Sequence, residues 1–552
     1  MSDPLIDIRP DHWKIVRDIL HRHVPQYEVW AFGSRAKWTA KEYSDLDLAV
    51  ITDRPLSLLV SASLSDDFSE SDLPFKVDVL DWHGISESFR KIIEKQYEVI
   101  QKGKRGNTGV AGGWVGRRIG SLGRVVTGKT PPTVDSSNFG GSYPFITIPD
   151  LDGRVFIEHS ERTLSDQGAG ALRTCLLPPG AVMMSCIATV GRCGVTTRPS
   201  LTNQQINSVV PNSNVDARFL YYVFTQIGHE LESAGGGGSV YTNVSKSRFS
   251  DIEIMIPEDI NEQRAIAHIL GTLDDKSELN RRMNATLEAI AGALFKSWFV
   301  DFDPVRAKSE GRDPGLLQPF ADLFPDSFDG SEFGKVPEGW GTQRFGDLLD
   351  LDKGLSYKGQ FLGETGMPMV NLGCFLGRGR FAELAIKQYS GEFKGRHVVR
   401  PRDLVMANTD LTQKREVIGS PALIPPREGL DQLLFTHHVF AARFREGKEP
   451  WKLFVYFSLL QEEFRERATG FAAGTTVLAL PRDTVLDLQS AAPPPALIGG
   501  FDSIVLPLIE RQWKAQEESR SLAELRDTLL PKLISGELRV HDAERLAAGA
   551  GA

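Results

Sequence analysis

The chain has 552 residues, a formal net charge of −9, 41% hydrophobic residues and 24% charged residues. That composition excludes a disordered or fibrous protein, and the length predicts roughly three to five domains of about 100 to 200 residues each. Because the charge balance is acidic, any nucleic-acid binding must rest on motifs and local basic patches.

Cysteine usage and the N-terminus indicate the compartment. The four cysteines form no C-x-x-C pair and have no histidine at zinc spacing, which argues against a disulfide framework or a structural metal. The first residues lack the basic and apolar regions of a signal peptide. No apolar run approaches the roughly 18 residues that span a bilayer. We therefore expect a cytoplasmic protein with no membrane partner.

The first hundred residues predict a small α/β domain. Residues 11–23 fit an amphipathic helix, and the stretches YEVWAFGS, SDLDLAVI and FKVDVLDW fit strands. Asp45 and Asp47 stand two residues apart on one predicted strand, so both carboxylates project from the same face. Asp78 falls in the next predicted strand. Residues 101–113, QKGKRGNTGVAGG, are polar and glycine-rich and predict a linker.

The rest of the chain contains an internal repeat. WVGRRIGSLGRVVTGKTP from Trp114 matches WGTQRFGDLLDLDKGLSY from Trp340, and Gly128 and Gly354 are among the shared residues. Further on, PPGAVMMSC matches RPRDLVMAN, and LTNQQINSVV matches LFTHHVFAAR. Two similar globular domains are therefore expected, each followed by a helix.

The two helices, predicted at about residues 261–298 and 496–534, align without a gap. Their apolar residues recur at alternating steps of four and three, which is the period of a coiled coil, so we expect the helices to pair with each other. Polar residues interrupt this seam midway, and they either face water or a subunit, or fix the register of the pair. The seam positions are Ile269, Leu273, Lys276, Asn280, Met283, Leu287, Ile290 and Leu294 in the first helix, and Ile504, Leu508, Arg511, Ala515, Glu518, Leu522, Leu525 and Leu529 in the second.

Two divergent globular segments, each followed by a matching long helix, resemble the DNA-specificity (S) subunit of type I restriction-modification enzymes. The resemblance implies two α+β target-recognition domains that each read half of an asymmetric split site in double-stranded DNA, separated by two long helices in an antiparallel coiled coil. It also implies docking of methylation (M) and restriction (R) subunits, with no cofactor in this part of the chain. The stretches that carry it are SVYTNVSKSRFSDIEIMIP (239–257), NEQRAIAHILGTLDDK (261–276), LFKSWFVDFDPVRAK (294–308), VPEGWG (336–341) and LRDTLLPKLISGEL (525–538).

Candidate DNA contacts lie in the repeated segments. Amide side chains can pair bidentately with adenine, and Arg or Lys can contact guanine or phosphate. A buried amide network is an equally good interpretation of the segment TNQQ. In the second repeat His437 and His438 replace two of these amides, as DNA contacts or simply as strand residues. The candidate contacts are Arg192, Asn203, Gln204, Gln205, Lys246 and Lys414.

The motif GSRA, an eight-residue gap and SDLDL resemble the minimal nucleotidyltransferases, a branch of the polymerase-beta-like superfamily. The resemblance implies that Asp45, Asp47 and Asp78 bind two Mg²⁺ ions and carry catalysis. The cofactors implied are Mg²⁺ and a nucleoside triphosphate, with ATP expected. The implied reaction transfers a nucleotide to a protein, such as a partner toxin, or to a small acceptor.

The same resemblance assigns the Gly-Ser turn to nucleotide phosphates. Gly33 permits a tight turn, Ser34 and neighbouring backbone N–H groups can hold a phosphate, and Arg35 can add a charged hydrogen bond. Trp38 departs from the pattern, because many relatives carry glycine there. Asp81 is either a substitute metal ligand or a solvated strand end.

The overall prediction is a mixed α/β protein with several domains. One alternative keeps the DNA-binding subunit but makes the first domain an inactive docking module, and another makes the repeats only a scaffold. The predicted parts are a nucleotidyltransferase-like domain (1–103), a linker (104–113), a first recognition domain (114–258), a central helical spacer (259–305), a linker (306–335), a second recognition domain (336–494), a distal helical spacer (495–540) and a tail (541–552).

Overall fold

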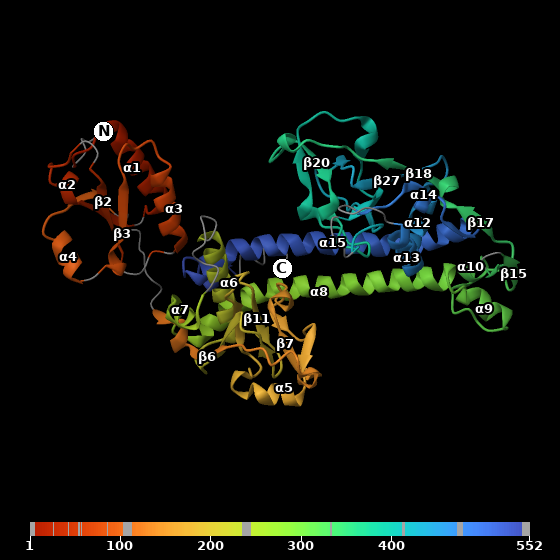
Figure 1. Cartoon of the computed structure of the whole chain (residues 1–552), viewed down its shortest axis with the longest axis horizontal. Coiled ribbons are helices and arrows are strands. Elements are labelled where there is room, and N and C mark those ends of the chain that lie inside the picture. Colours follow the sequence, from red (N-terminus) through yellow and green to blue (C-terminus); the bar gives the residue numbers. More distant parts are fainter. Residues whose placement is uncertain are drawn as a thin grey trace. The chain divides into compact units, whose positions relative to one another are not determined.

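The structure is a computed structural model of the whole chain (Figure 1). Contacts divide the chain into two compact units, residues 1–278 with 521–552 and residues 279–520. Within the first unit we call residues 6–102 the head domain and residues 114–258 the first repeat domain, and within the second unit we call residues 336–494 the second repeat domain. The residues described are 6–25, 27–41, 44–52, 56, 58–85, 87–102, 113–234, 244–331, 334–410, 415–471 and 478–543.

The head domain contains a four-stranded sheet in the order β3-β2-β1-β4. Strand β1 is antiparallel to both β2 and β4, whereas β2 and β3 are parallel. Side chains alternate between the two faces of a strand, so the apolar residues of α1 and α3 cover one face and share a core with it. The elements are α1 Pro10–His23, β1 Glu28–Phe32, α2 Gly33–Ala36, β2 Leu46–Ile51, α3 Leu58–Ser69, β3 Val77–Asp81, a 3-10 turn Trp82–Gly84, α4 Glu87–Ile93 and β4 Glu98–Gln101.

The first repeat domain combines a five-stranded sheet (β6-β13-β10-β11-β8), a three-stranded sheet (β12-β7-β9) and the pair β14-β5. Its helix α6 packs on the five-stranded sheet within one buried cluster. The elements are β5 Trp114–Arg118, β6 Gly123–Thr127, β7 Phe139–Ile146, β8 Phe156–Ile157, β9 Arg162–Leu164, α5 Asp166–Ala171, β10 Val182–Ser185, β11 Cys193–Thr196, β12 Leu201–Thr202, β13 Ile206–Pro211, α6 Ala217–Ala234, α7 Lys246–Asp251 and β14 Glu253–Pro257.

The second repeat domain has sheets in the orders β18-β27-β23-β25 and β19-β21-β20-β26-β22, and the pairs β17-β29 and β24-β28. Its strands are β17 Gly341–Arg344, β18 Leu349–Lys353, β19 Leu362–Gly363, β20 Met367–Val370, β21 Lys387–Tyr389, β22 Val398–Val399, β23 Leu404–Ala407, β24 Thr409–Asp410, β25 Pro421–Leu423, β26 Leu433–Phe435, β27 Val439–Phe444, β28 Leu478–Ala479 and β29 Gln489–Ala492. Its helices are α11 Phe345–Leu348, α12 Lys452–Leu459, α13 Glu462–Phe471 and α14 Arg482–Leu486.

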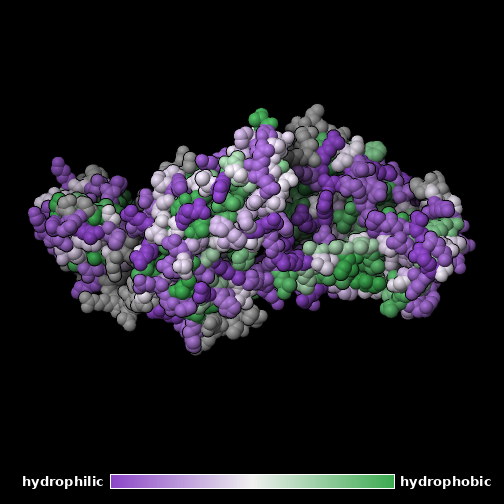
Figure 2. All heavy atoms as spheres, turned by 90° about the horizontal axis from the view of Figure 1, so that it is seen from below, coloured by the Kyte–Doolittle hydropathy of each residue, from purple (hydrophilic) through white to green (hydrophobic). Residues whose placement is uncertain are grey.

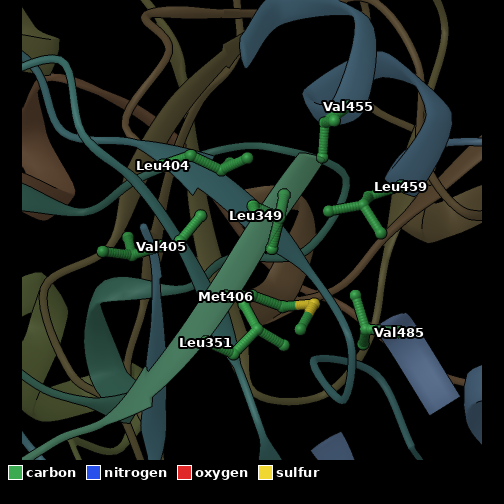
Figure 3. Close-up of a pocket in the computed structure, with 9 residues that line it drawn as sticks. Leu349, Leu351, Leu404, Val405, Met406, Val455, Leu459 and Val485 are labelled. Atoms are coloured by element: carbon green, nitrogen blue, oxygen red, sulfur yellow. The ribbon is translucent and has the colours of Figure 1, made fainter. Parts of the chain in front are cut away.

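The core of the second repeat domain is apolar and closely packed. Figure 3 shows a cavity between β18, β23 and α12, lined by aliphatic side chains such as Leu349, Met406 and Val455. The cavity measures about 10 Å³, which is space for about one water molecule. Because its lining offers no polar partner, we interpret it as a packing defect of the core and not as a ligand site.

The internal repeat predicted from the sequence is confirmed by matching backbone hydrogen bonds. Gly128 donates to the carbonyl of Ile206 (3.1 Å), and Gly354 donates to the carbonyl of Val439 (3.3 Å). A Cβ atom on either glycine would collide with backbone oxygens, of Asn203 in the first case and Phe435 in the second. The shared glycines are therefore explained by the close approach of two backbone segments.

The two long helices, α8 Ile260–Phe299 and α15 Pro495–Ile534, end within a residue or two of their predicted bounds. In the first unit the beginning of α8 packs on the end of α15, where Leu273 and Leu529 share a buried cluster. In the second unit the end of α8 packs on the beginning of α15, where Phe295 and Phe501 share another. The helices therefore run antiparallel, as predicted.

The predicted seam is correct in the first unit. In the second unit Ala515 is buried and Leu294, Ile504 and Leu508 pack on the core, so the seam is wrong there only locally, at Ile290. Ile269 and Leu273 are buried as expected, but Ile290 is 49% exposed, and the buried residues of that turn are Ala291 and Phe295. A straight α-helix has 3.6 residues per turn, whereas the predicted seam assumes 3.5. The seam positions therefore rotate gradually around α8, and those far from the starting end no longer all face α15. Figure 2 shows apolar atoms gathered along this exposed stretch of α8.

The polar interruption of the seam is a buried contact. Asn280 is 2% exposed, and its Nδ2 donates to Glu518 Oε2 (2.7 Å) and Ser519 Oγ (3.3 Å). Lys276 and Arg511, in contrast, are exposed. The buried amide favours the interpretation that this polar position fixes the register of the pair.

The segment predicted as the second linker is structured. The segment 306–335, predicted to be a linker, contains part of α9 Asp303–Ser309, then α10 Gln318–Ala321 and strand β15 Phe328–Ser331, which pairs with β16 Gly334–Pro337. Phe324 from this segment is 2% exposed and packs on Trp298 at a ring distance of 5.2 Å.

The linker predicted at 104–113 lies, apart from its last residue, outside the described residues. Within the described chain, no helix is long and apolar enough to span a membrane.

Candidate functional site

The acidic cluster lies on the open face of the head sheet. Asp47 of β2 and Asp78 of β3 are register partners in a parallel pair, and Asp45 precedes β2 by one residue. Register partners project from the same face, while Leu46 and Leu48 point to the other face and are fully buried. The alternation of β2 therefore brings the three predicted carboxylates to one surface.

Burial and mutual repulsion act on these carboxylates. The pKa of Asp47 is raised, first by its partial burial and then by the negative charges of Asp78 and Asp45. Lys76 lies on the same strand face as Asp78, and its Nζ is 2.6 Å from Asp78 Oδ1. Sequence reasoning missed Lys76, although its position two residues before Asp78 signals this proximity.

The donor set suits a hard cation in its chemistry, because all three groups are carboxylates and their charges repel one another. The three carboxylates do not form a closed coordination sphere. Among the described residues, no group of three acidic, His or Cys side chains is close enough together to hold a metal. The Lys76 ammonium is the cation that Asp78 contacts. A metal bound by all three carboxylates would have to replace Lys76 at Asp78.

The Gly-Ser turn lies against the cluster. Gly33 has φ +76°, and a Cβ atom there would collide with Asp47 Oδ2. Glycine is therefore required twice, for its backbone conformation and for the approach to the carboxylate. Ser34, half-buried at the start of α2, follows directly, and its carbonyl accepts a hydrogen bond from Thr39 N (3.0 Å).

Arg35 does not fit its predicted role as a phosphate ligand. It is 5% exposed, and its guanidinium lies 3.7 Å from the ring centre of Phe75. Nε donates to the carbonyl of Ser44 (2.9 Å) and Nη1 to the carbonyl of Asp7 (2.8 Å). Burial lowers its pKa. Arg35 thus fastens the Gly-Ser turn to the segment before β2.

Two other head residues depart from a simple motif. Trp38 has φ +57° and is 62% exposed, so it occupies a backbone conformation that favours glycine. Asp81 accepts hydrogen bonds from the Thr52 hydroxyl, Leu56 N (2.8 Å) and His83 N (3.0 Å). These bonds make Asp81 a structural residue that ties together the segments following β2 and β3.

The candidate DNA contacts of the first repeat domain divide into two groups. Asn203 is 9% exposed, its Nδ2 donates to Gln205 Oε1 (2.9 Å), and its Oδ1 accepts from Gln205 N (3.1 Å). These two residues therefore form the amide network that was one of the two predicted alternatives. Gln204 is exposed and accepts from Thr130 Oγ1 (2.7 Å).

The remaining basic candidates are exposed near the same end of the sheet. Arg192 precedes β11, and Lys246 begins α7. Cys186 N donates to the carbonyl of Gln205 (2.7 Å), and Val244 N donates to the carbonyl of Cys186 (2.8 Å). These backbone bonds bring the segments after β10, before β13 and before α7 together.

The second repeat domain repeats this arrangement with other side chains. Asn408 N donates to the carbonyl of His438 (3.0 Å), and Leu480 N donates to the carbonyl of Asn408 (2.8 Å). His438 Nδ1 is 2.8 Å from Thr409 Oγ1, and burial followed by the neighbouring His437 lowers its pKa. Lys414 lies outside the described residues.

Comparisons with known proteins match the two parts of the chain separately. Residues 15–105 match the family described as polymerase beta, nucleotidyltransferase, and residues 111–289 match the type I restriction modification DNA specificity domain. The chain is 56% identical over 97 residues to the "Probable protein adenylyltransferase MntA" of Haemophilus influenzae, which covers 18% of this chain and 85% of that protein.

The larger part matches over nearly its full length. The chain is 27% identical over 440 residues to the type I restriction enzyme MjaIX specificity subunit of Methanocaldococcus jannaschii, covering 78% of this chain and 94% of that protein. Among solved structures, the S subunit of a type I restriction-modification system from M. genitalium matches 76% of this chain and 96% of that chain at 16% identity, with a TM-score of 0.45.

Proposed function

We propose that the chain joins two activities, because it belongs to the DNA specificity subunits of type I restriction-modification enzymes. Its first part is a domain of the polymerase-beta-type nucleotidyltransferase family. Its repeat domains, residues 114–258 and 336–494, bind the halves of a split asymmetric site in double-stranded DNA. Its head domain, residues 1–103, transfers a nucleotide in a Mg²⁺-dependent reaction.

The repeated backbone frame is the observation that supports split-site recognition best. Equivalent hydrogen bonds hold the segment before β13 and the segment before β27, but the side chains at these positions differ between the domains. A common frame with different side chains is suited to reading two different half-sites. In the first domain, exposed Arg192, Gln204 and Lys246 are the candidates for contacting DNA, and Asn203 and Gln205 support them from beneath.

The long helices offer a surface for the partner subunits. Leu279 of α8 is 60% exposed and Ile290 is 49% exposed, and Leu506 of α15 is 38% exposed. Exposed apolar side chains along a helix are typical of a surface that another protein covers. We assign this surface to methylation (M) subunits, with restriction (R) subunits joining the assembled complex.

In the head domain, Asp45, Asp47 and Asp78 are assigned to hold Mg²⁺, and the Gly33–Ser34 turn to hold the phosphates of ATP. Bound Mg²⁺ would supply positive charge against the phosphates and the leaving pyrophosphate. The acceptor hydroxyl attacks the α-phosphorus and forms a P–O bond, the bond to the β-phosphate breaks, and the hydroxyl proton passes to solvent. The likeness to a protein adenylyltransferase favours a protein, such as a toxin-like partner, as the acceptor of AMP.

Two observations favour an inactive docking module as the second candidate. The Lys76 Nζ lies 2.6 Å from Asp78 Oδ1, and Trp38 near the phosphate turn holds a backbone conformation that favours glycine. Under that alternative, the carboxylates would be retained only as surface charges. Metal binding by the intact chain therefore separates the two candidates.

The test uses the purified chain with its methylation subunit. With ATP radiolabelled at the α-phosphate and Mg²⁺, the proposal expects label to be transferred to protein, and it expects EDTA or Asp47→Asn to remove that label. DNA methylation by the same complex should be unchanged by Asp47→Asn. Labelling that persists in the Asp47→Asn variant would contradict the assigned role of the acidic cluster.

A further inference from the structure

An aromatic pair lies next to the acidic cluster on the open face of the head sheet. Phe32, the last residue of β1, is the register partner of Asp47, which is in turn the partner of Asp78. The row across three strands therefore reads Asp78, Asp47, Phe32. Directly opposed residues project from the same face, and burial agrees, because Ala31 and Leu48 on the other face are fully buried.

Helix α4 adds a second ring to this row. Phe89 meets Phe32 edge to face, with ring centroids 6.3 Å apart and planes at 86°. Phe89 remains 38% exposed. Further along the same face, Trp30 stacks on Tyr97 with centroids 3.7 Å apart, and its ring surface is thereby covered. The Phe32–Phe89 pair is thus the exposed end of an aromatic surface, on the side of the carboxylates.

We propose that Phe32 and Phe89 form the subsite for the nucleobase of the nucleoside triphosphate. This inference rests on the proposed function of the head domain and names how that site holds its substrate. Phosphates at the Gly33–Ser34 turn place the nucleoside within reach of the neighbouring row of the sheet. A planar base can then stack against the exposed ring of Phe89.

The chemistry of the subsite sets its selectivity. Every base presents a π face, so stacking on an aromatic side chain increases affinity with little choice among bases. Asp47 and Asp78, in the same row of the sheet as Phe32, are assigned to the metal and not to the base. The aromatic rings are therefore the groups in this row that are left to bind the base. ATP and GTP are therefore expected to bind with similar affinity, and both more tightly than a triphosphate that lacks a base.

The experiment measures binding by the full chain in Mg²⁺, using ATP and inorganic tripolyphosphate as the two probes in calorimetry. For Phe89→Ala we expect the Kd for ATP to rise about tenfold or more, while the Kd for tripolyphosphate stays constant. Phe89→Tyr keeps the ring and should retain ATP affinity. Ile92→Ala, at a 60% exposed position on the same helix, is the matched control and should bind both probes as the unmodified chain does.

Three results would overturn the inference. If Phe89→Ala binds ATP as tightly as the unmodified chain, no base stacks on this ring. If that variant keeps its ATP affinity but loses transfer to the protein acceptor, the ring serves the acceptor instead. If the unmodified chain binds neither ATP nor tripolyphosphate, the nucleotidyltransferase function itself fails, and this inference fails with it.

Discussion

The two repeat domains share a fold, yet they are joined to the long helices by different chemistry. In the first unit, Tyr222 of α6 donates to Asp274 Oδ2 of α8 (2.6 Å), and Arg526 of α15 donates to Asp274 Oδ1 (2.8 Å). In the second unit, Phe457 of α12 meets Phe295 of α8 and Phe501 of α15, with ring centroids 5.7 and 5.8 Å apart.

The difference shows that one architecture can be stabilised in two ways. In the first unit it is stabilised by hydrogen bonds and an ion pair centred on Asp274, which we call the hub, and in the second unit by aromatic packing around Phe295, which we call the aromatic join. The Asp274 contacts depend on charge and therefore on ionic strength, although burial protects them from full screening. The aromatic cluster depends on volume and apolar area. Each join should therefore fail under its own kind of perturbation.

Removing the central ring of the aromatic join should have the largest effect. Phe295 is 2% exposed and contacts four other phenylalanine rings. Phe295→Ala should destabilise the second unit by about 3–5 kcal/mol, because a buried ring is replaced by a cavity. Denaturant unfolding measures the change, and Leu279→Ala, at a 60% exposed position, should cost under about 0.5 kcal/mol. Equal costs at the two positions would disprove the aromatic join.

Removing the hub carboxylate should have a somewhat smaller effect in the first unit. Asp274→Ala leaves the part-buried guanidinium of Arg526 and the buried hydroxyl of Tyr222 without this acceptor, at a cost of about 3 kcal/mol. Asp275→Ala, whose carboxylate is 62% exposed and pairs with Arg218, should cost under about 1 kcal/mol. Thermal unfolding at two salt concentrations checks both, and indifference of the first unit to Asp274→Ala would refute the hub.

The shared glycines should respond alike in both domains. Gly128→Ala and Gly354→Ala each force a Cβ against backbone oxygens, so each should destabilise its own domain by about 1–3 kcal/mol. Gly170→Ala is the matched control, since a Cβ there meets nothing within 4 Å. A strong effect at one glycine and none at the other would break the equivalence of the repeats.

The smallest effect concerns a carboxyl with no counterpart in the other helix. At an offset of 235, Asp502 of α15 aligns with buried Ala267 of α8. Burial raises the pKa of Asp502 to about 7, from 3.8. The folded chain therefore retains a proton that the unfolded chain releases, and the stability that this proton contributes is lost as pH rises from about 4 through about 7.

Asp502→Ala should remove that loss. The full shift would correspond to roughly 4 kcal/mol, but Asp502 is only partly buried, so screening by solvent reduces the expected gain to roughly 1 kcal/mol. Relative to the unmodified chain, the variant should therefore gain about 2–4 °C in Tm at pH 8. At pH 5 the gain should be smaller, because the carboxyl is then mostly protonated in the fold. A gain of the same size at both pH values would show that Asp502 stays ionised when folded.

Much of this architecture follows from local patterns. The alternation of β2 and β3 predicts that Asp47 and Asp78 share a face, and the repeated Gly128 and Gly354 predict equivalent domains. These features are predictable because strand period and glycine backbone freedom are properties of short segments.

Features that depend on distant partners are not predictable in this way. The burial of Arg35 depends on carbonyl groups of Asp7 and Ser44 that only the fold brings to it. The buried face of α8 in the second unit depends on the rings that α12 and α15 present there. The pairing of Phe32 with Asp47 requires the register of β1 against β2, which no single segment specifies.

The most direct test of the whole account is a genome-wide map of DNA methylation by the chain and its methylation subunit, with and without Asp47→Asn. The account predicts one split, asymmetric motif that is methylated equally in both samples, because the repeat domains choose the site and the head acts separately. The absence of any motif, or a motif lost in Asp47→Asn, would contradict it.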